Sequence, residues 1–311
     1  MEYGVRSGYG DLKRVIMHRP GAELHRVRPD TLTEFNFDCP VDVEAFTADY
    51  DDMLDTFHRH GVETLLLTDI LADDDDALGY IRHRPNMTYT RDLATVFKSG
   101  AVLMGPHLRG RWGDQAMLGR AFKRLGIPIL GAIEQPDFLE GGGVIPIGED
   151  TIAASICDRA NENGTRALRE IVLGTDAQYF LDVPLPFGEI HIDGTFMVLD
   201  EQFCVVHEPT FEVFPCRLYE AGKPEPRHVM FLDFLAERGF TCITFDDDER
   251  DAMCANITIT RRGTSAIGFA GAPRVNAAIE SHGIAITTVS GETLALGNGG
   301  PHCMTCPVLV V

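Results

Sequence analysis

A cysteine and a histidine–aspartate pair, far apart in the chain, are the residues best suited to chemistry. Cys303 lies in a short stretch that begins Gly299-Gly300-Pro301. A cysteine on a turn of glycines and proline has little packing role, so its thiol is free to meet a ligand. His191 and Asp193 alternate along a strand-like run, which places both side chains on one face. Together these residues predict a thiol enzyme.

The chemistry of a larger constellation is more specific. A thiolate beside a histidine is a nucleophile with a proton shuttle, and a carboxylate that orients the imidazole completes a triad-like arrangement. Glu140, followed by three glycines, is the candidate for that carboxylate. Two further carboxylates, Asp92 and Asp193, match a planar cation with several N–H donors. A guanidinium group is the natural substrate, and its positive charge would lower the pKa of Cys303.

Five helix-like segments, each leading into a short apolar run, must position these residues. The pairs are 44–60 with 62–67, 113–125 with 127–132, 159–173 with 177–182, 226–238 with 240–245, and 272–282 with 284–289. Hairpin signatures follow at 94–104, 144–154, 196–206 and 257–269. This repetition predicts an α/β fold of five ββαβ-type units packed around an axis. No composition break divides the chain, so we expect one domain, 1–311.

A polar cluster follows each helix–strand pair, at or before the next hairpin. The clusters are Asn86 to Asp92, Glu140 to Gly143, His191 to Asp193, Asn256, and Gly299 to Cys303. Equivalent positions in a ring of repeats converge on its axis. The pattern therefore predicts that the acidic residues, the histidine and the cysteine meet at one mouth of the ring.

The overall charge narrows the class of ligand. Asp and Glu total 47 against 27 Lys and Arg, a net charge of -20, which disfavours nucleic acid and anionic membranes and favours cations. The sequence shows no signal peptide and no apolar run near the length of about 18 residues that a membrane helix needs. We therefore expect a cytoplasmic protein whose eight cysteines are mostly buried and reduced. The sequence is compatible with a homo-oligomer.

Four sequence blocks, in order, resemble the signature blocks of the guanidino-group-modifying enzymes, which include arginine deiminases and amidinotransferases. The blocks are Asn86-Met87-Thr88-Tyr89-Thr90-Arg91-Asp92, Leu139-Glu140-Gly141-Gly142, His191-Ile192-Asp193 and Gly299-Gly300-Pro301-His302-Cys303-Met304. The resemblance extends over nearly the whole chain. It implies the five-bladed α/β propeller called pentein, in agreement with the five units.

The resemblance also implies a role for each residue of the constellation. Cys303 would attack the guanidinium carbon, and His191 would protonate the departing amine or ammonia and then activate a water. Glu140 would orient His191, while Asp92 and Asp193 would hold the guanidinium nitrogens. Members of the superfamily need no metal or organic cofactor, so neither is expected.

A carboxylate-binding set is implied in the same way. Arg111 and Arg159 fall where arginine deiminases place arginines for the substrate α-carboxylate, and Asn86 lies near the same end. The chain departs from the family at Gly143, where an aspartate is usual, and at Asn298, where deiminases carry an arginine. It also has no room for the helical insertion of typical arginine deiminases.

These observations favour a hydrolase that converts free arginine or a close analogue to citrulline and ammonia through a thiouronium adduct on Cys303. An amidinotransferase, an arginine dihydrolase giving ornithine, and a non-catalytic guanidino-binding protein are the alternatives. The Cys303-x-x-Cys306 spacing also fits a redox pair or half of a zinc site, but neither sequence context is present. His302 is left out of the chemistry because neighbours on a strand point to opposite faces.

Overall fold

The computed structural model describes residues 1–311, and its strands form five separate sheets. Each sheet holds an antiparallel strand pair and a third strand parallel to the second, as in β17(Cys306–Val310)-β1(Leu12–Met17)-β2(Glu63–Leu66). The next three sheets along the chain are β3(Ala94–Val96)-β4(Ala101–Leu103)-β5(Ile129–Ala132), β6(Val144–Ile147)-β7(Thr151–Ile156)-β8(Tyr179–Pro184), and β9(Phe196–Asp200)-β10(Phe203–Val206)-β13(Thr241–Thr244). The fifth is β14(Thr258–Arg261)-β15(Ser265–Phe269)-β16(Ala285–Val289).

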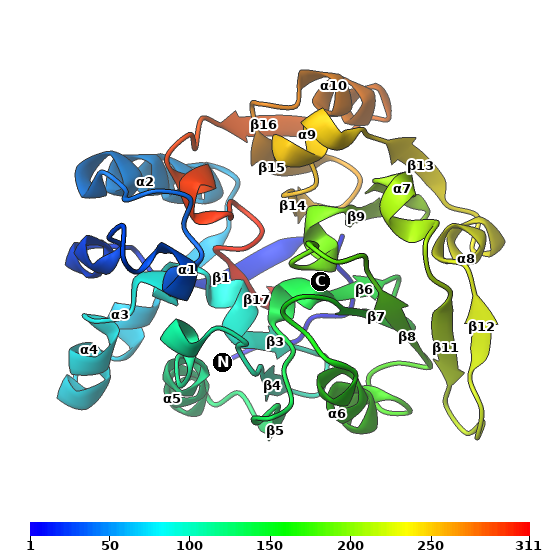
Figure 1. Cartoon of the computed structure of the whole chain (residues 1–311), viewed down its shortest axis with the longest axis horizontal. Helices are drawn as coiled ribbons and strands as arrows, with labels where there is room; N and C mark the ends of the chain where they lie inside the picture. Colours follow the sequence, from blue (N-terminus) through cyan, green and yellow to red (C-terminus); the bar gives the residue numbers. More distant parts are fainter.

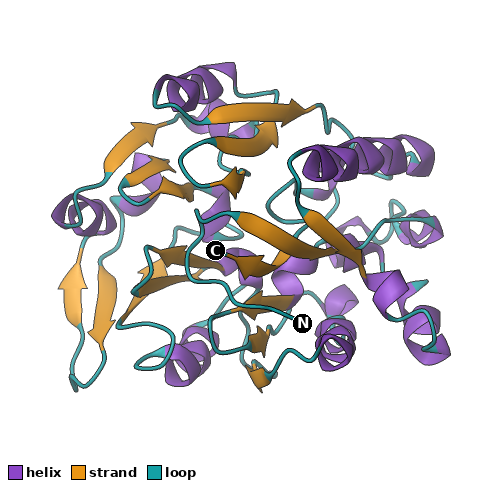
Figure 2. Ribbon diagram, turned by 180° about the vertical axis from the view of Figure 1, so that it is seen from behind, coloured by secondary structure: helices purple, strands orange, loops and turns teal.

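Helices supply the crossovers that parallel strand pairs require. The crossover helices are α2 (Val43–Arg59), α5 (Gln115–Leu125), α6 (Glu162–Val172), α8 (Phe231–Glu237) and α10 (Pro273–Ser281). Shorter helices are α1 (Leu32–Phe35), α3 (Leu67–Ile70), α4 (Asp75–Ile81), α7 (Glu208–Phe211) and α9 (Asp247–Asp251). The crossover helices lie at the rim and the first strands of the sheets lie nearer the middle (Figures 1 and 2). None of the helices combines the length and apolar character needed to cross a membrane.

The prediction of a mixed α/β chain is confirmed, and all four hairpins form where they were expected. The sheets share no strands, so they do not form one closed barrel. One boundary was wrong, because segment 226–238 begins as strand β12 (Arg227–Val229) before α8 starts. This strand pairs with β11 (Cys216–Glu220), which extends the third sheet beyond β8. Pairing with a partner strand outweighs the local helix preference there.

The first sheet closes through strands from opposite parts of the sequence. Strand β17 pairs antiparallel with β1, with Ile16 opposite Cys306 and Leu12 opposite Val310. The backbone of Gly4 adds a further bridge, donating its N–H to Val308 at 2.8 Å. Because no local turn links these strands, the hairpin signatures of the sequence could not reveal this pair.

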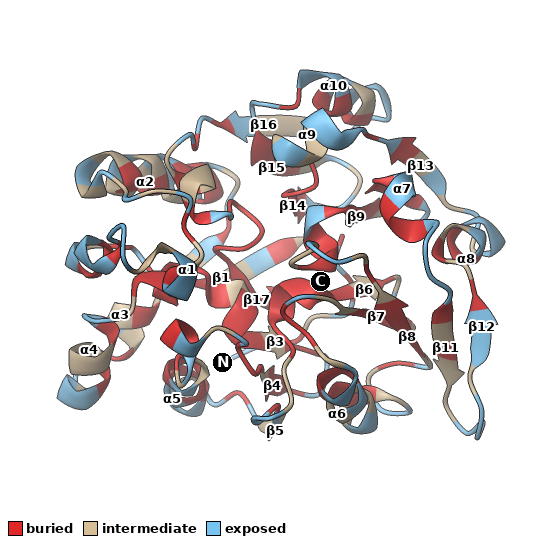
Figure 3. Cartoon of the chain, viewed as in Figure 1, coloured by how far each residue is buried: buried red, intermediate tan, exposed pale blue.

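Buried side chains of α2 hold the helix against the first sheet. Its buried positions recur every three or four residues, as expected for one apolar helix face, and include Phe46, Tyr50, Met53 and Phe57. The side chain of Asp42 caps the helix by accepting hydrogen bonds from two backbone N–H groups. Figure 3 shows the same division in the other crossover helices, which bury their inner sides and expose their outer sides.

We expect Phe46→Ala to lower the free energy of unfolding by about 3–5 kcal/mol, because it removes a fully buried ring and leaves a cavity. Phe187→Ala is the matched control, since that ring is 98% exposed and its loss should change stability by less than about 0.5 kcal/mol. Urea unfolding followed by circular dichroism measures both values. Equal losses for the two variants would contradict this description of the core.

Candidate active site

Every sheet contributes one polar segment to the same place, just before its first strand. Asp92 precedes β3, Glu140 precedes β6, His191 and Asp193 precede β9, Asn256 precedes β14, and Cys303 precedes β17. The convergence that the repeat pattern predicted is therefore present. Hydrogen bonds and ion pairs connect these segments to one another.

A tight turn presents Cys303. The turn is closed by the N–H of Met304, which donates to the carbonyl of Gly300 at 2.9 Å. A Cβ atom on Gly300 would lie 2.3 Å from the ring of Phe269, so only glycine fits. The Cys303 side chain is buried, and its Sγ accepts a hydrogen bond from Asn256 Nδ2 at 3.1 Å. The turn thus fixes the thiol inside the protein.

His191 faces carboxylates on both sides of its ring. Its Nε2 lies 2.8 Å from Glu140 Oε2, and its Nδ1 lies 3.9 Å from one oxygen each of Asp92 and Asp193. Burial opposes protonation, but Asp92, Glu140 and Asp193 together raise the pKa of His191 above its ordinary value. The raised pKa favours an imidazolium, which can act as a general acid toward a group held near Nδ1.

Glu140 is fully buried and fully paired. Its Oε1 accepts the N–H of His107 at 3.0 Å, and its Oε2 accepts Arg159 Nη1 at 3.1 Å in addition to His191. Arg111 Nη1 approaches the same oxygen to 3.5 Å. Burial would raise the pKa of Glu140, but the two guanidinium groups and His191 hold it below its ordinary value. The group stays an anion and fixes the orientation of the imidazole.

The carboxylates of Asp92 and Asp193 both lie close to the backbone of Gly142. Asp92 Oδ1 accepts the N–H of Gly142 at 3.2 Å, and Asp92 Oδ2 accepts Arg111 Nη1 at 2.7 Å. A Cβ atom on Gly142 would lie 2.6 Å from His191 Nδ1 and 3.1 Å from Asp193 Oδ2. The space where these groups face one another therefore exists only because residue 142 is glycine, as the glycine run after Glu140 suggested.

The surroundings of Cys303 favour its neutral thiol. Burial first, and then the negative charges of Asp193 and Asp92, raise the pKa of Cys303 above its ordinary value of 9.0. The thiolate is the nucleophilic form, and an added positive charge beside Cys303 would offset these effects and favour it. A bound guanidinium group would supply that charge.

Alkylation tests this state of the thiol. Without substrate, we expect iodoacetamide to modify Cys303 slowly at neutral pH and faster as the pH rises past 9.0, because the raised pKa keeps the thiol neutral below that point. Mass spectrometry of the Cys303 peptide measures the rate, and the half-exposed Cys39 serves as the internal comparison. A Cys303 rate that is already maximal at neutral pH would contradict the protonated thiol.

An inner cavity of about 330 Å³ lies against the thiol. It is lined by Asn86, Asp92, Arg111, Arg159, His191 and Cys303 among the predicted site residues. Asp193 lines a wider outer cavity that shares His191 and Cys303, and Glu140 lies behind His191. Three polar atoms of residues that line the inner cavity are buried without a hydrogen-bond partner: Asn86 Oδ1, Tyr89 Oη and Arg111 Nε. All eight predicted residues are thus brought together, and their individual roles stay predictions.

Sequence reasoning missed two residues of this centre. His302 Nδ1 lies 2.8 Å from Asp193 Oδ2, although strand alternation had excluded His302 from the site. The alternation rule does not apply, because residues 301–304 form a turn that precedes β17. Asn256 was recognised as a polar cluster but not as a partner of the thiol. The only signal for it was its position before a first strand.

Two groups of three side chains could hold a metal ion. They are Asp193 with His302 and Cys303, and Asp92 with Glu140 and His191, each with ligand atoms within 4.8 Å of one another. Such mixed donors suit zinc. In the second group, however, Glu140 and Asp92 are already bonded to guanidinium groups, which compete with a cation. The metal-free site implied by the sequence resemblance stays a prediction.

Comparison with known proteins places the chain in a family. The family model described as "N,N dimethylarginine dimethylhydrolase, eukaryotic" matches residues 41–310. The arginine deiminase of Mycolicibacterium gilvum is 23% identical, with 98% of this chain and 97% of that protein covered. The arginine deiminase of Rhodococcus erythropolis is 22% identical, covering 98% and 96% respectively.

Solved structures show the same fold at low identity. DDAH from Pseudomonas aeruginosa, a cysteine-to-serine mutant complexed with citrulline, has a TM-score of 0.72 at 17% identity, covering 96% of this chain and 100% of that chain. An amidinotransferase from Microseira wollei has a TM-score of 0.70 at 13% identity, with 99% and 97% covered. The N-terminal domain of ArgZ, an arginine dihydrolase, has a TM-score of 0.70 at 12% identity, with 96% and 98% covered. The chain belongs to the N,N dimethylarginine dimethylhydrolase family, within the guanidino-group-modifying superfamily that its sequence blocks resemble.

Proposed function

We propose that the protein hydrolyses the guanidino group of free arginine or a close analogue through a covalent adduct on Cys303. The observation that supports this most is the convergence of a buried thiol, an imidazole with a raised pKa and two carboxylates around Gly142. A planar cation with N–H donors on several sides matches two facing carboxylates. The thiol needs a cation to ionise, and a guanidinium group satisfies both requirements.

The first half of the proposed reaction forms the adduct. Asp92 and Asp193 hold the guanidinium nitrogens, and the bound positive charge lowers the pKa of Cys303 so that its thiol releases a proton to solvent. The thiolate forms a C–S bond to the guanidinium carbon. His191 then donates its Nδ1 proton to one nitrogen, the C–N bond breaks, and ammonia or an amine leaves. The result is a thiouronium adduct on Cys303 and a neutral imidazole.

The second half releases the product. A water molecule loses a proton to His191 and its oxygen forms a C–O bond to the thiouronium carbon. The hydroxyl proton passes to the sulfur as the C–S bond breaks, which restores the Cys303 thiol, and the ureido product leaves as citrulline when the substrate is arginine. His191 is protonated again, and Glu140 holds its ring in one orientation throughout. In sum, one water is consumed, and one ammonia or amine is released together with the proton that the thiol gave up.

The inner cavity suggests what the rest of the substrate carries. Asn86 Oδ1 can accept from an ammonium group, whereas Arg111 Nε and Tyr89 Oη can donate to a carboxylate. An α-amino acid carries both groups, so its zwitterionic end would satisfy these unpaired atoms. Arg111 and Arg159 would then serve both this end and the catalytic carboxylates with which they pair.

In this proposal the five sheets are the five blades of a pentein propeller in one catalytic domain.

A second substrate, N,N-dimethylarginine, is favoured by the family match. It has the same amino-acid end and the same guanidinium core, and its hydrolysis would release dimethylamine in place of ammonia. The two substrates therefore differ only in the amine that leaves as the adduct forms, and both give the same adduct.

A product assay tests the proposed function. The protein is incubated with arginine or N,N-dimethylarginine, with and without glycine, and citrulline, ammonia, dimethylamine and ornithine are measured. We expect citrulline with one equivalent of ammonia or dimethylamine. Product that forms only with glycine would indicate amidino transfer, and ornithine with ammonia would indicate the dihydrolase reaction. If neither compound reacts or protects Cys303 from iodoacetamide, the proposed function is wrong.

The amino-acid end can be tested at Asn86. We expect Asn86→Ala to raise KM for arginine by up to about tenfold, the worth of one hydrogen bond, and to leave KM for methylguanidine unchanged. Asn163→Ala on the exposed face of α6 is the control. Steady-state kinetics with both compounds measure the difference. Equal increases for the two compounds would exclude a role in binding the amino-acid end.

A further inference from the structure

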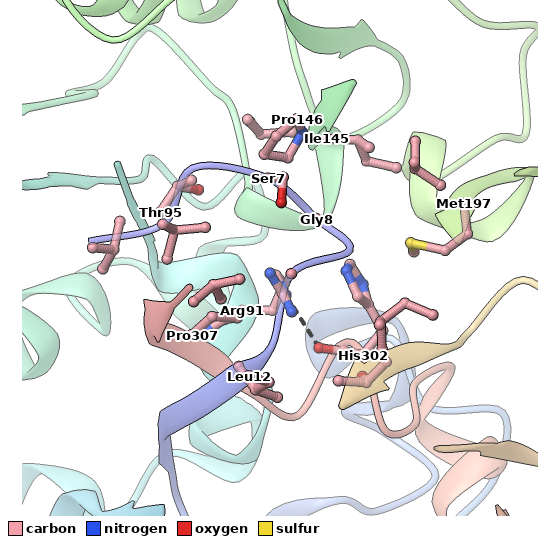
Figure 4. A pocket seen from close by; sticks show the side chains of 18 of the residues that line it. Ser7, Gly8, Leu12, Arg91, Thr95, Ile145, Pro146, Met197, His302 and Pro307 are labelled. Carbon is pink, nitrogen blue, oxygen red and sulfur yellow. Dashed lines mark hydrogen bonds between the residues drawn. The ribbon is translucent and has the colours of Figure 1, made fainter. Parts of the chain in front are cut away.

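A second cavity, here called the rear cavity, lies behind the turn that presents Cys303. It is lined by the first strands of the five sheets and by residues 5–10, and its volume is about 710 Å³ (Figure 4). His302 lines the rear cavity, whereas Cys303, its neighbour in the chain, lines the inner cavity. The turn therefore forms a wall with one residue facing each side.

His302 is held firmly in this wall. Its N–H donates to Asn256 Oδ1 at 2.9 Å, and its carbonyl oxygen accepts Arg91 Nε at 3.1 Å. The second bond is the dashed line in Figure 4, where the side chains of Arg91 and His302 both extend into the rear cavity. The imidazole reaches Asp193 with Nδ1, at 2.8 Å from Oδ2. Two hydrogen bonds thus hold the backbone of His302, and a third connects its ring to Asp193.

The orientation of the Asp193 carboxylate depends on His302 more than the orientation of the Asp92 carboxylate depends on any one partner. The carboxylate of Asp92 accepts two hydrogen bonds, from Arg111 and from the N–H of Gly142. The carboxylate of Asp193 accepts only one bond shorter than 3.5 Å, from His302, and the thiol of Cys303 lies at 3.7 Å. Without His302, this buried carboxylate would keep only its longer contacts with the Cys303 thiol and with His191 Nδ1, at 3.7 and 3.9 Å.

Arg111, the partner of Asp92, and His302, the partner of Asp193, also differ in charge. Arg111 is a cation and offsets the charge of Asp92. Burial, followed by the charge of Arg91, lowers the pKa of His302, so the ring is neutral at physiological pH and donates Nδ1–H to Asp193. A neutral donor orients the carboxylate without cancelling its charge.

We propose that His302 is a positioning residue, which orients Asp193 from the rear cavity as a neutral hydrogen-bond donor and so sets the affinity of the site for the guanidinium group. This inference rests on the proposed reaction at Cys303. It assigns His302 no contact with the substrate and no proton transfer. Its effect is transmitted only through the carboxylate of Asp193.

Two substitutions of His302 separate positioning from packing. His302→Leu removes the donor, and His302→Asn keeps it, because the amide nitrogen of asparagine is as far from Cβ as the imidazole Nδ1. We expect His302→Leu to raise KM for arginine about ten- to hundredfold, as for loss of a hydrogen bond to a charged group, with a much smaller change in kcat. His302→Asn should recover most of the affinity. Met197→Leu, at another position of the rear cavity, should leave both constants unchanged.

The stability of each variant and its direct binding of arginine are measured in addition to KM and kcat. Thermal unfolding is measured for each variant, and arginine dissociation constants are measured by calorimetry in a Cys303→Ser background with and without His302→Leu. An unchanged KM and an unchanged dissociation constant in His302→Leu would overturn the proposal. So would a His302→Asn variant that loses as much affinity as His302→Leu. The calorimetric comparison does not need turnover, so it tests His302 even if the proposed hydrolysis is wrong.

Discussion

Cys303→Ser is expected to lower kcat for arginine by about 10⁴-fold or more while leaving arginine binding close to that of the wild type. Loss of a nucleophile costs several orders of magnitude in comparable enzymes, because the hydroxyl of serine is a far weaker nucleophile in a site without a strong base beside it. The substitution changes a single atom, and Asp92, Asp193 and the inner cavity remain in place. Citrulline formation measures the first effect and calorimetry with arginine measures the second.

Cys306→Ser provides the matched control for this experiment. Cys306 is also fully buried, but its Sγ approaches the carbonyl of Ala94 and has no contact with the site. We expect this variant to keep wild-type kcat, although it can lose stability because a hydroxyl is less apolar than a thiol. Residual wild-type activity in Cys303→Ser, or loss of kcat in Cys306→Ser, would show that the nucleophile has been misassigned.

Glu140→Gln is expected to have the second largest effect, on activity and stability together. We expect kcat to fall by about 10³–10⁴-fold, the cost of losing the carboxylate that orients a catalytic histidine. The glutamine also leaves Arg111 and Arg159 without their shared anion at Glu140, which should lower the free energy of unfolding by about 3–5 kcal/mol. Citrulline assays and urea unfolding measure the two losses.

The pH dependence of the stability loss distinguishes charge from shape. The folded protein holds the pKa of Glu140 below its ordinary value of 4.5. The carboxylate therefore contributes its full stability above that value and loses it as the pH falls toward the lowered pKa. The difference between wild type and Glu140→Gln should be constant near neutral pH and shrink in strong acid. Glu134→Gln, on an exposed glutamate, should change neither property.

The main features of the site could be predicted because they repeat. The positions of Asp92, Glu140, His191 and Cys303 recur before first strands, so local helix and hairpin signals in each unit were enough to bring them together. Local signals could not reveal the pairing of β17 with β1 or the extension of the third sheet by β11 and β12, since both depend on partners far along the chain or on a neighbouring strand. His302 was missed because its role depends on a turn that the strand rule treated as extended chain.

Each sheet supplies one polar segment to the site, and this affects the order in which structure and activity return during refolding. Each sheet can form its own hydrogen bonds separately, but the thiol meets its partners only after all five sheets have docked. Circular dichroism should therefore recover before activity when the unfolded protein is diluted into buffer, and the delay between them measures the docking step. During heating, loosening of any single sheet is enough to stop the reaction, so enzymatic activity reports on the integrity of the entire architecture.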